Sequence, residues 1–216
     1  MRASKWFARL GRPALRSEGV GTIDQQGEPQ HRAAATTSSP EKENFGHRGA
    51  SGHAPDNTLT GLRIAAELGA DACEIDIQRT ADGRCAVIHD AFLRSADGRV
   101  LPVQRSTLDE LQRVPLAGGE RVPTLEEMLE LAGDLRLGLY IEVKDGAAIP
   151  LLIDALHDAK ATRRVMVGSF RPDWVAEVGA LDPELRTAVL FGSAHMDAVA
   201  LARSTGASRL QLASAD

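Results

Sequence analysis

The sequence has little of several residue types, and each shortage excludes a class of protein. Only two of its 216 residues are cysteine, Cys73 and Cys85, so neither a disulfide scaffold nor a thiolate metal site is expected. It has no apolar run of about 18 residues, the length that a transmembrane helix needs. A formal net charge of -5 provides no basic stripe to displace the counterions of a nucleic acid. We therefore expect a cytoplasmic protein with neither a transmembrane segment nor a nucleic-acid partner.

The remaining composition is sufficient for one folded domain. Hydrophobic residues make up 43% of the chain, which is enough for one sizeable core, and the length favours a single domain. Residues 1–44 differ, because they are polar and lack a sustained hydrophobic period; they are predicted to be a disordered extension or to follow a misassigned start codon. As in an organelle transit peptide, five basic residues precede their first acid: Arg2, Lys5, Arg9, Arg12 and Arg16. Residues 45–216 are expected to form the folded domain.

From Phe45 onward, short apolar runs alternate with helical patterns. Thr124 and Glu127 have the spacing of a capping box, and apolar residues follow at helical intervals up to Gly133. Asn57 is expected to cap an earlier helix. This alternation predicts an α/β fold in which helices cover a parallel sheet. Periodicity alone does not separate an open doubly wound sheet from a closed barrel.

Two acidic residues interrupt a predicted strand that is otherwise largely apolar. Glu74 and Asp76 are two residues apart, so their side chains point to the same face of the strand. Carboxylates in such a place repel each other and resist burial unless a cation compensates them. A hard divalent ion such as Mg²⁺ or Ca²⁺ is the natural partner of carboxylate oxygens. The alternative is an exposed strand face on which the acids are solvated.

A predicted hairpin brings a histidine to this acidic pair. Asp82-Gly83 lies between two strand-like runs and is typical of a two-residue loop. With that loop, Asp76 lies directly opposite His89 on the same side of the sheet. The same register places Cys73 and Cys85 on opposite faces, which argues against a disulfide between them.

Two clusters at predicted strand ends add titratable and cationic groups. His47 and Arg48 follow the first strand, and Lys144 ends the strand after the capping-box helix. Imidazoles titrate near neutral pH, so His47 and His89 can together activate a nucleophile and protonate a leaving group. Arg48 and Lys144 either balance the charge of the acids or hold an anionic phosphate.

These residues belong to short motifs whose combination is specific because they recur in one order. The motifs are His47-Arg48-Gly49, Pro55-Asp56-Asn57-Thr58, Glu74-Ile75-Asp76, Thr80-Ala81-Asp82-Gly83, His89-Asp90, Pro123-Thr124-Leu125-Glu126-Glu127, Ile141-Glu142-Val143-Lys144 and Ser169-Phe170. Their order and spacing resemble the glycerophosphodiester phosphodiesterase family over nearly all of residues 45–216. The resemblance implies a TIM-type (β/α) barrel with its site at the carboxyl ends of the strands.

The resemblance also implies an activity. In that family the acids that match Glu74, Asp76 and Glu142 hold one divalent cation, here Mg²⁺ or Ca²⁺. The histidines that match His47 and His89 act as general base and general acid. The substrate class is a glycerophosphodiester such as glycerophosphocholine, and the products are glycerol 3-phosphate and an alcohol.

Two departures from the family pattern leave alternatives open. Asp56 stands where the family usually has glutamate, so no ligand role is carried onto it. The sequence predicts a barrel truncated after about six of eight strands, those around His47, Glu74, Glu142, Ser169, Leu190 and Leu210. Open edges of such a barrel would allow self-association. The alternatives are a catalytically inactive fragment or pseudoenzyme of the family, and a related barrel phospholipase acting on a phosphoinositide or sphingolipid.

Overall fold

The computed structural model describes residues 7–9, 44–95, 97–192 and 198–212. The chain divides into two compact units, of which one comprises Met1–Leu10 and Glu43–Asp216 and the other comprises Gly11–Lys42. All described residues belong to the first unit. Apart from residues 7–9 and 44, the predicted extension lies outside the described residues, and its disorder stays a prediction.

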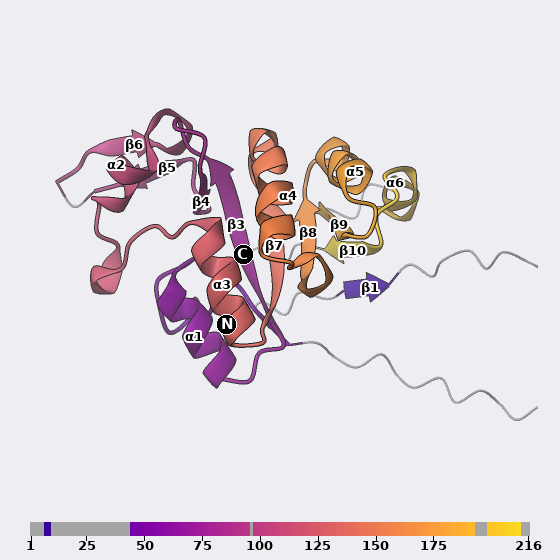
Figure 1. The fold of residues 1–216 in the computed structure, drawn as a ribbon, viewed down its shortest axis with the longest axis horizontal. Helices are drawn as coiled ribbons and strands as arrows, with labels where there is room; N and C mark the ends of the chain where they lie inside the picture. Colours follow the sequence, from indigo (N-terminus) through magenta and orange to yellow (C-terminus); the bar gives the residue numbers. More distant parts are fainter. Residues whose placement is uncertain (1–6, 10–43, 96, 193–197, 213–216) are drawn as a thin grey trace, which may run out of the picture. The chain divides into compact units, whose positions relative to one another are not determined.

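Six parallel strands form the centre of the fold, as the sequence predicted (Figure 1). In the order in which they pair, they are β2 (Phe45–Gly46), β3 (Ala72–Arg79), β7 (Gly138–Val143), β8 (Val165–Ser169), β9 (Arg186–Phe191) and β10 (Arg209–Leu212). The sheet curves as part of a TIM-type barrel, which confirms the predicted fold class.

Two antiparallel strands extend this sheet. Strand β4 (Cys85–Val87) forms a hairpin with β3. Strand β1 (Phe7–Arg9) pairs with β10, the strand whose outer edge was predicted to be open. Self-association through open barrel edges stays a prediction.

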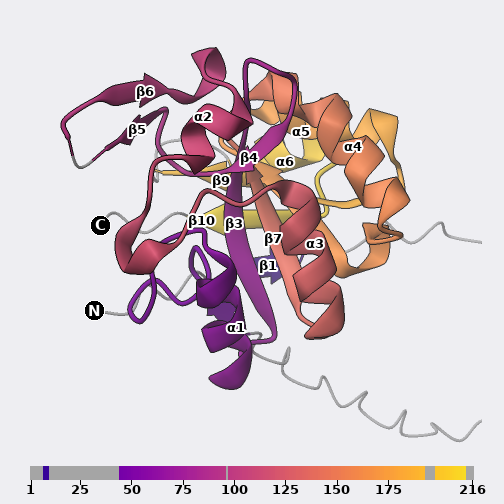
Figure 2. The same cartoon turned by 60° about the vertical axis from the view of Figure 1, so that its left-hand side comes forward.

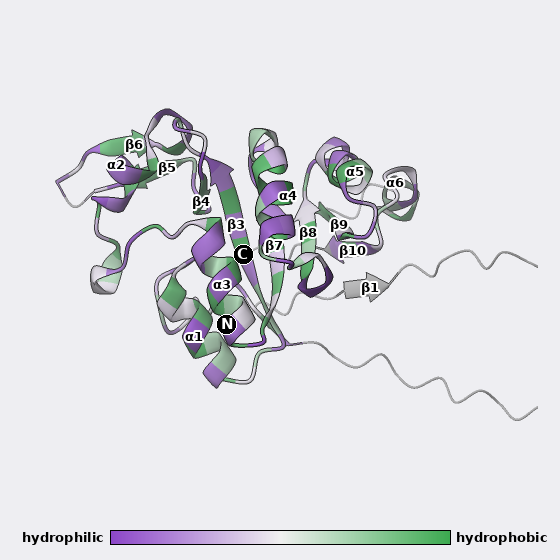
Figure 3. Ribbon diagram, in the orientation of Figure 1, coloured by the Kyte–Doolittle hydropathy of each residue, from purple (hydrophilic) through white to green (hydrophobic). Residues whose placement is uncertain are grey.

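Helices cover one face of the sheet (Figure 2). They are α1 (Leu59–Glu67), α3 (Leu125–Asp134), α4 (Ile149–Asp158), α5 (Pro172–Leu181) and α6 (Ala198–Ser204). Each contains both hydrophobic and hydrophilic residues (Figure 3). The predicted capping box begins α3: Thr124 accepts a hydrogen bond from the Glu127 N–H, and Glu127 accepts one from the Thr124 N–H. None of the helices in the described part of the chain is long and apolar enough to cross a membrane.

A small lobe follows β4 and packs around its own apolar cluster. It contains β5 (Phe92–Arg94), β6 (Val100–Pro102) and α2 (Leu108–Gln112). Strands β5 and β6 pair only with each other in the described sheets, so this lobe is an addition to the barrel strands.

The two faces of the central strands bury different side chains. Along β7, Leu139, Ile141 and Val143 join the core beneath the helices, because alternate residues of a strand point the same way. Tyr140 points to the opposite face and belongs to a separate apolar cluster there. Gly168 makes room for it, since a Cβ at that position would overlap the Tyr140 hydroxyl group. The face without helices is therefore also packed, around a tyrosine.

The β3–β4 hairpin differs by one residue from the predicted register. Ile77 pairs with Val87, whereas a two-residue loop would pair it with Ile88. The loop instead has three residues, 81–83. Gly83 takes a φ of 73°, which is typical of three-residue hairpin loops with a glycine in the left-handed region.

This register corrects two predictions. Asp76 and His89 are not a facing pair, because β4 ends before His89. Cys73 and Cys85 do not lie on opposite faces, because both are buried in the core beneath the helices. Both thiols are free, and burial raises the pKa of each to about 12.

Candidate active site

The turn after β2 carries the first predicted site residues. Arg48 and Gly49 both have positive φ, of 49° and 83°. A Cβ on Gly49 would lie 2.9 Å from the carbonyl carbon of Gly61, so glycine alone fits this close approach. The Arg48 N–H donates a hydrogen bond to a carboxylate oxygen of Glu74 at 2.9 Å. His47 lies against the same carboxylate, with Nε2 3.6 Å from Oε2.

Three buried carboxylates meet at the carboxyl ends of β3 and β7. One oxygen from each of Glu74, Asp76 and Glu142 lies within 4.8 Å of the others, and the three residues are 2%, 0% and 3% exposed. The parallel register places Asp76 directly beside Glu142. At an effective dielectric constant of 20, two like charges about 4 Å apart repel by about 4 kcal/mol. The cluster therefore needs positive charge beside it.

Two side chains supply part of this charge. Lys144 Nζ lies 2.5 Å from a Glu142 oxygen and 3.4 Å from an Asp76 oxygen. Arg48 Nε lies 3.6 Å from Asp76, and its guanidinium also donates to Asp56 at 2.9 Å. Burial raises the pKa of Glu142, although Lys144 opposes this effect. Since three carboxylates face two cations, the donor set fits the expected Mg²⁺ or Ca²⁺, which prefer oxygen ligands of this kind.

Asn57 is a site residue that sequence reasoning missed. Its amide donates to a carboxylate oxygen of Asp76 at 2.9 Å, and its carbonyl oxygen accepts the Asp76 N–H at 3.1 Å. Asn57 is only 3% exposed and has a φ of 59°, which asparagine tolerates better than most residues. The cap of α1 is instead Thr58, whose hydroxyl accepts the Gly61 N–H. Asn57 therefore orients Asp76, and the prediction that it caps the helix is wrong.

His89 lies in the segment after β4. Its Nδ1 lies 2.8 Å from an Asp90 oxygen, and about a third of its side chain is exposed. It lines a cavity of about 240 Å³ together with Arg48 and Asp56. Arg48 therefore connects this cavity to the carboxylate cluster.

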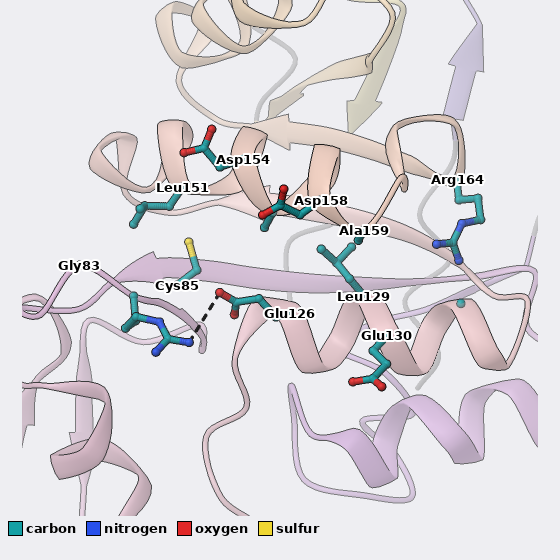
Figure 4. A pocket seen from close by; sticks show the side chains of 13 residues that line it. Gly83, Cys85, Glu126, Leu129, Glu130, Leu151, Asp154, Asp158, Ala159 and Arg164 are labelled. Atoms are coloured by element: carbon teal, nitrogen blue, oxygen red, sulfur yellow. Dashed lines mark ion pairs between the residues drawn. The ribbon is translucent and has the colours of Figure 1, made fainter.

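A second cavity, of about 580 Å³, lies between α3 and α4 and contains none of the predicted site residues (Figure 4). Its walls carry four exposed acids, Glu126, Glu130, Asp154 and Asp158. Both helices cover the face of the sheet opposite to the carboxylate cluster. We therefore place the candidate active site at the smaller cavity, where charged and titratable groups converge.

Comparisons with known proteins identify the family of the chain. Residues 47–215 match the model of the Glycerophosphoryl diester phosphodiesterase family. A glycerophosphodiester phosphodiesterase of Caldanaerobacter subterraneus is 35% identical over 158 residues, which are 67% of this chain and 65% of that protein. One of Bacillus altitudinis is 33% identical over 68% of this chain and 65% of its own length. The chain thus spans slightly less than two thirds of the length of these relatives.

Solved structures share the fold. An Oleispira antarctica phosphodiesterase in complex with the product sn-glycerol-3-phosphate has a TM-score of 0.71 at 25% identity, over 76% of this chain and 72% of that chain. A putative glycerophosphoryl diester phosphodiesterase from Silicibacter pomeroyi has a TM-score of 0.69 at the same identity and coverage. The motifs, the curved parallel sheet and these matches together show that the chain belongs to the glycerophosphoryl diester phosphodiesterase family.

Proposed function

We propose that the chain hydrolyses glycerophosphodiesters to glycerol 3-phosphate and an alcohol with the help of one divalent cation. The observation that carries this proposal is the buried cluster of Glu74, Asp76 and Glu142 with Arg48 and Lys144 beside it. Family membership and the glycerol 3-phosphate complex of the Oleispira protein support the substrate class.

Charged side chains of the chain would bind the phosphate. A cation held by the three acids would offset the negative charge that develops on the phosphoryl oxygens. Arg48 and Lys144 each lie within 4 Å of the acid cluster and keep about a fifth of their side chains exposed. From there they can hold an anionic phosphate, and the guanidinium of Arg48 can bind two oxygens at once.

The two histidines would move the protons. One takes a proton from the attacking water and the other gives a proton to the leaving alcohol. Each ring lies beside a carboxylate: His47 Nε2 is 3.6 Å from a Glu74 oxygen, and His89 Nδ1 is 2.8 Å from an Asp90 oxygen, which orients the His89 ring. The exposed part of each ring faces solvent or the cavity, so a substrate can reach it.

The test is release of glycerol 3-phosphate from glycerophosphocholine by the purified chain, with and without EDTA. His47→Ala and His89→Ala should each lower the metal-dependent activity by about 10²- to 10⁴-fold, the contribution typical of general acid–base catalysis, and leave a residual rate. The matched control is His157→Ala, because His157 lies in the last turn of α4 and pairs with Asp182, away from the carboxyl ends of the strands. This control should keep activity within about a factor of two, the change expected of a surface substitution away from the site.

Two outcomes would contradict the proposal. A folded chain without turnover in Mg²⁺ or Ca²⁺ would be a non-catalytic member of the family. Turnover of sphingomyelin or phosphatidylinositol in place of glycerophosphocholine would assign it to the related barrel phospholipases.

A further inference from the structure

Gln78 is a buried polar residue to which the proposed chemistry assigns no role. It lies on β3 two residues after Asp76, so its side chain is on the same face as the acids. Only 2% of it is exposed. Its amide nitrogen donates to three successive backbone carbonyls, of Ile88 at 3.2 Å, His89 at 3.0 Å and Asp90 at 2.9 Å. Two amide protons are thus shared among three acceptors.

These bonds hold the segment that carries His89 in place just beyond the end of the β3–β4 pairing. The last backbone hydrogen bond between β3 and the segment after β4 is donated by the Ile88 N–H to the Asp76 carbonyl, at 2.9 Å. Beyond it the chain turns away toward the small lobe. Gln78 therefore ties the carbonyls of residues 88–90 to β3 at the point where backbone pairing no longer does so.

We propose that Gln78 is a positioning residue for His89, an inference that rests on the proposed function. Glu74 and Asp76 come from β3 directly, and Gln78 fixes the backbone of His89 to the same strand. One rigid strand thereby sets the separation between the metal-binding acids and the imidazole. Such a separation matters because a misplacement of about 1 Å can cost about 10²-fold in rate.

The first test is Gln78→Met, which keeps the length of the side chain and removes both donors. We expect kcat to fall by about 10- to 100-fold, because His89 loses its fixed position. The KM for glycerophosphocholine and the affinity for Mg²⁺ should each change by less than about threefold, because the phosphate- and metal-binding groups are untouched. An unchanged kcat, or a loss confined to metal affinity, would overturn the proposal.

The second test is the double-mutant cycle with His89→Ala. If Gln78 acts through His89, Gln78→Met should lower kcat by less than about threefold once the imidazole is gone. A merely structural role would give the full loss again in the His89→Ala background. That additive result would refute the positioning role.

The matched control is Gln112→Met. Gln112, at the end of α2, also donates its amide to a backbone carbonyl, that of Val122 at 3.0 Å, but it has no described hydrogen bond to residues 88–90. We expect its kcat to stay within about twofold of the wild-type value.

Amide hydrogen exchange keeps the test independent of turnover. A wild-type chain that turns over no glycerophosphodiester would contradict the proposed function, and exchange would then decide whether Gln78 holds the His89 segment. In Gln78→Met, the Ile88 N–H, which donates to the Asp76 carbonyl, should exchange at least about tenfold faster, while β3 and β7 keep their protection. Unchanged exchange of the Ile88 N–H would overturn the inference.

Discussion

Replacing Lys144 with methionine removes the cation nearest to the carboxylate cluster. Its Nζ lies 2.5 Å from Glu142 and 3.4 Å from Asp76, and both acids are buried. Breaking a buried ion pair by removing one partner costs about 3–5 kcal/mol, and the partial exposure of Lys144 places the expected loss near the lower figure. In a domain of this size each kcal/mol lowers Tm by about 2–4 °C, so the metal-free variant should melt about 6–12 °C below the wild type.

Thermal denaturation followed by circular dichroism, in EDTA and then in excess Mg²⁺ or Ca²⁺, measures this loss. The ion should restore part of the stability of Lys144→Met, because it supplies the missing positive charge and binds the folded state alone. Lys160→Met is the matched control: Lys160 is exposed, has no acid partner among the described ion pairs, and loses the same charge. A metal-free Lys144→Met variant that melts within about 2 °C of the wild type would refute the reasoning.

Three further substitutions test packing, helix propensity and a helix cap. Gly168→Ala should destabilise the fold by about 1–3 kcal/mol in urea denaturation, because the added Cβ would overlap the Tyr140 hydroxyl group. Gly179→Ala should instead stabilise the fold by up to about 1 kcal/mol, because its added Cβ meets open space on helix α5. A hydrogen bond from Arg121 lowers the pKa of Glu127, so the contribution of Glu127 to stability is complete above its ordinary pKa of 4.5 and is lost as the pH falls through the lowered value. Glu127→Gln should therefore lower Tm at neutral pH but not in acid below the lowered pKa of Glu127, and an equal loss in both conditions would contradict this.

The architecture could be predicted from the sequence because its signals are local. Alternating apolar runs and helical stripes specified the six parallel strands and the helices between them, and the capping box of Thr124 and Glu127 marked the start of α3. The hairpin register could not be predicted in the same way. Asp82-Gly83 suits both a two-residue loop and a three-residue loop that ends with glycine at positive φ, and the choice between them shifts every facing pair.

The candidate site was predictable where strand geometry alone brings residues together. The two-residue period of β3 aligns Glu74 with Asp76. The role of Glu142 was implied by the family resemblance alone, and parallel pairing of β7 with β3 places it beside Asp76. Asn57 and Gln78 escaped prediction because their contacts depend on how a loop folds back over the strand. An amide in a polar motif gives no sign of the carboxylate or carbonyl that it will bind.

The two cysteines can serve as built-in probes of local unfolding in the core between the helices and the sheet. Cys73 and Cys85 are the only cysteines in the sequence, and the folded protein keeps both thiols buried and protonated. A thiol reagent attacks the thiolate, so it can modify these residues only after the helices separate from β3 and β4. The rate of thiol labelling therefore reports how often the barrel wall exposes its core, without any introduced label.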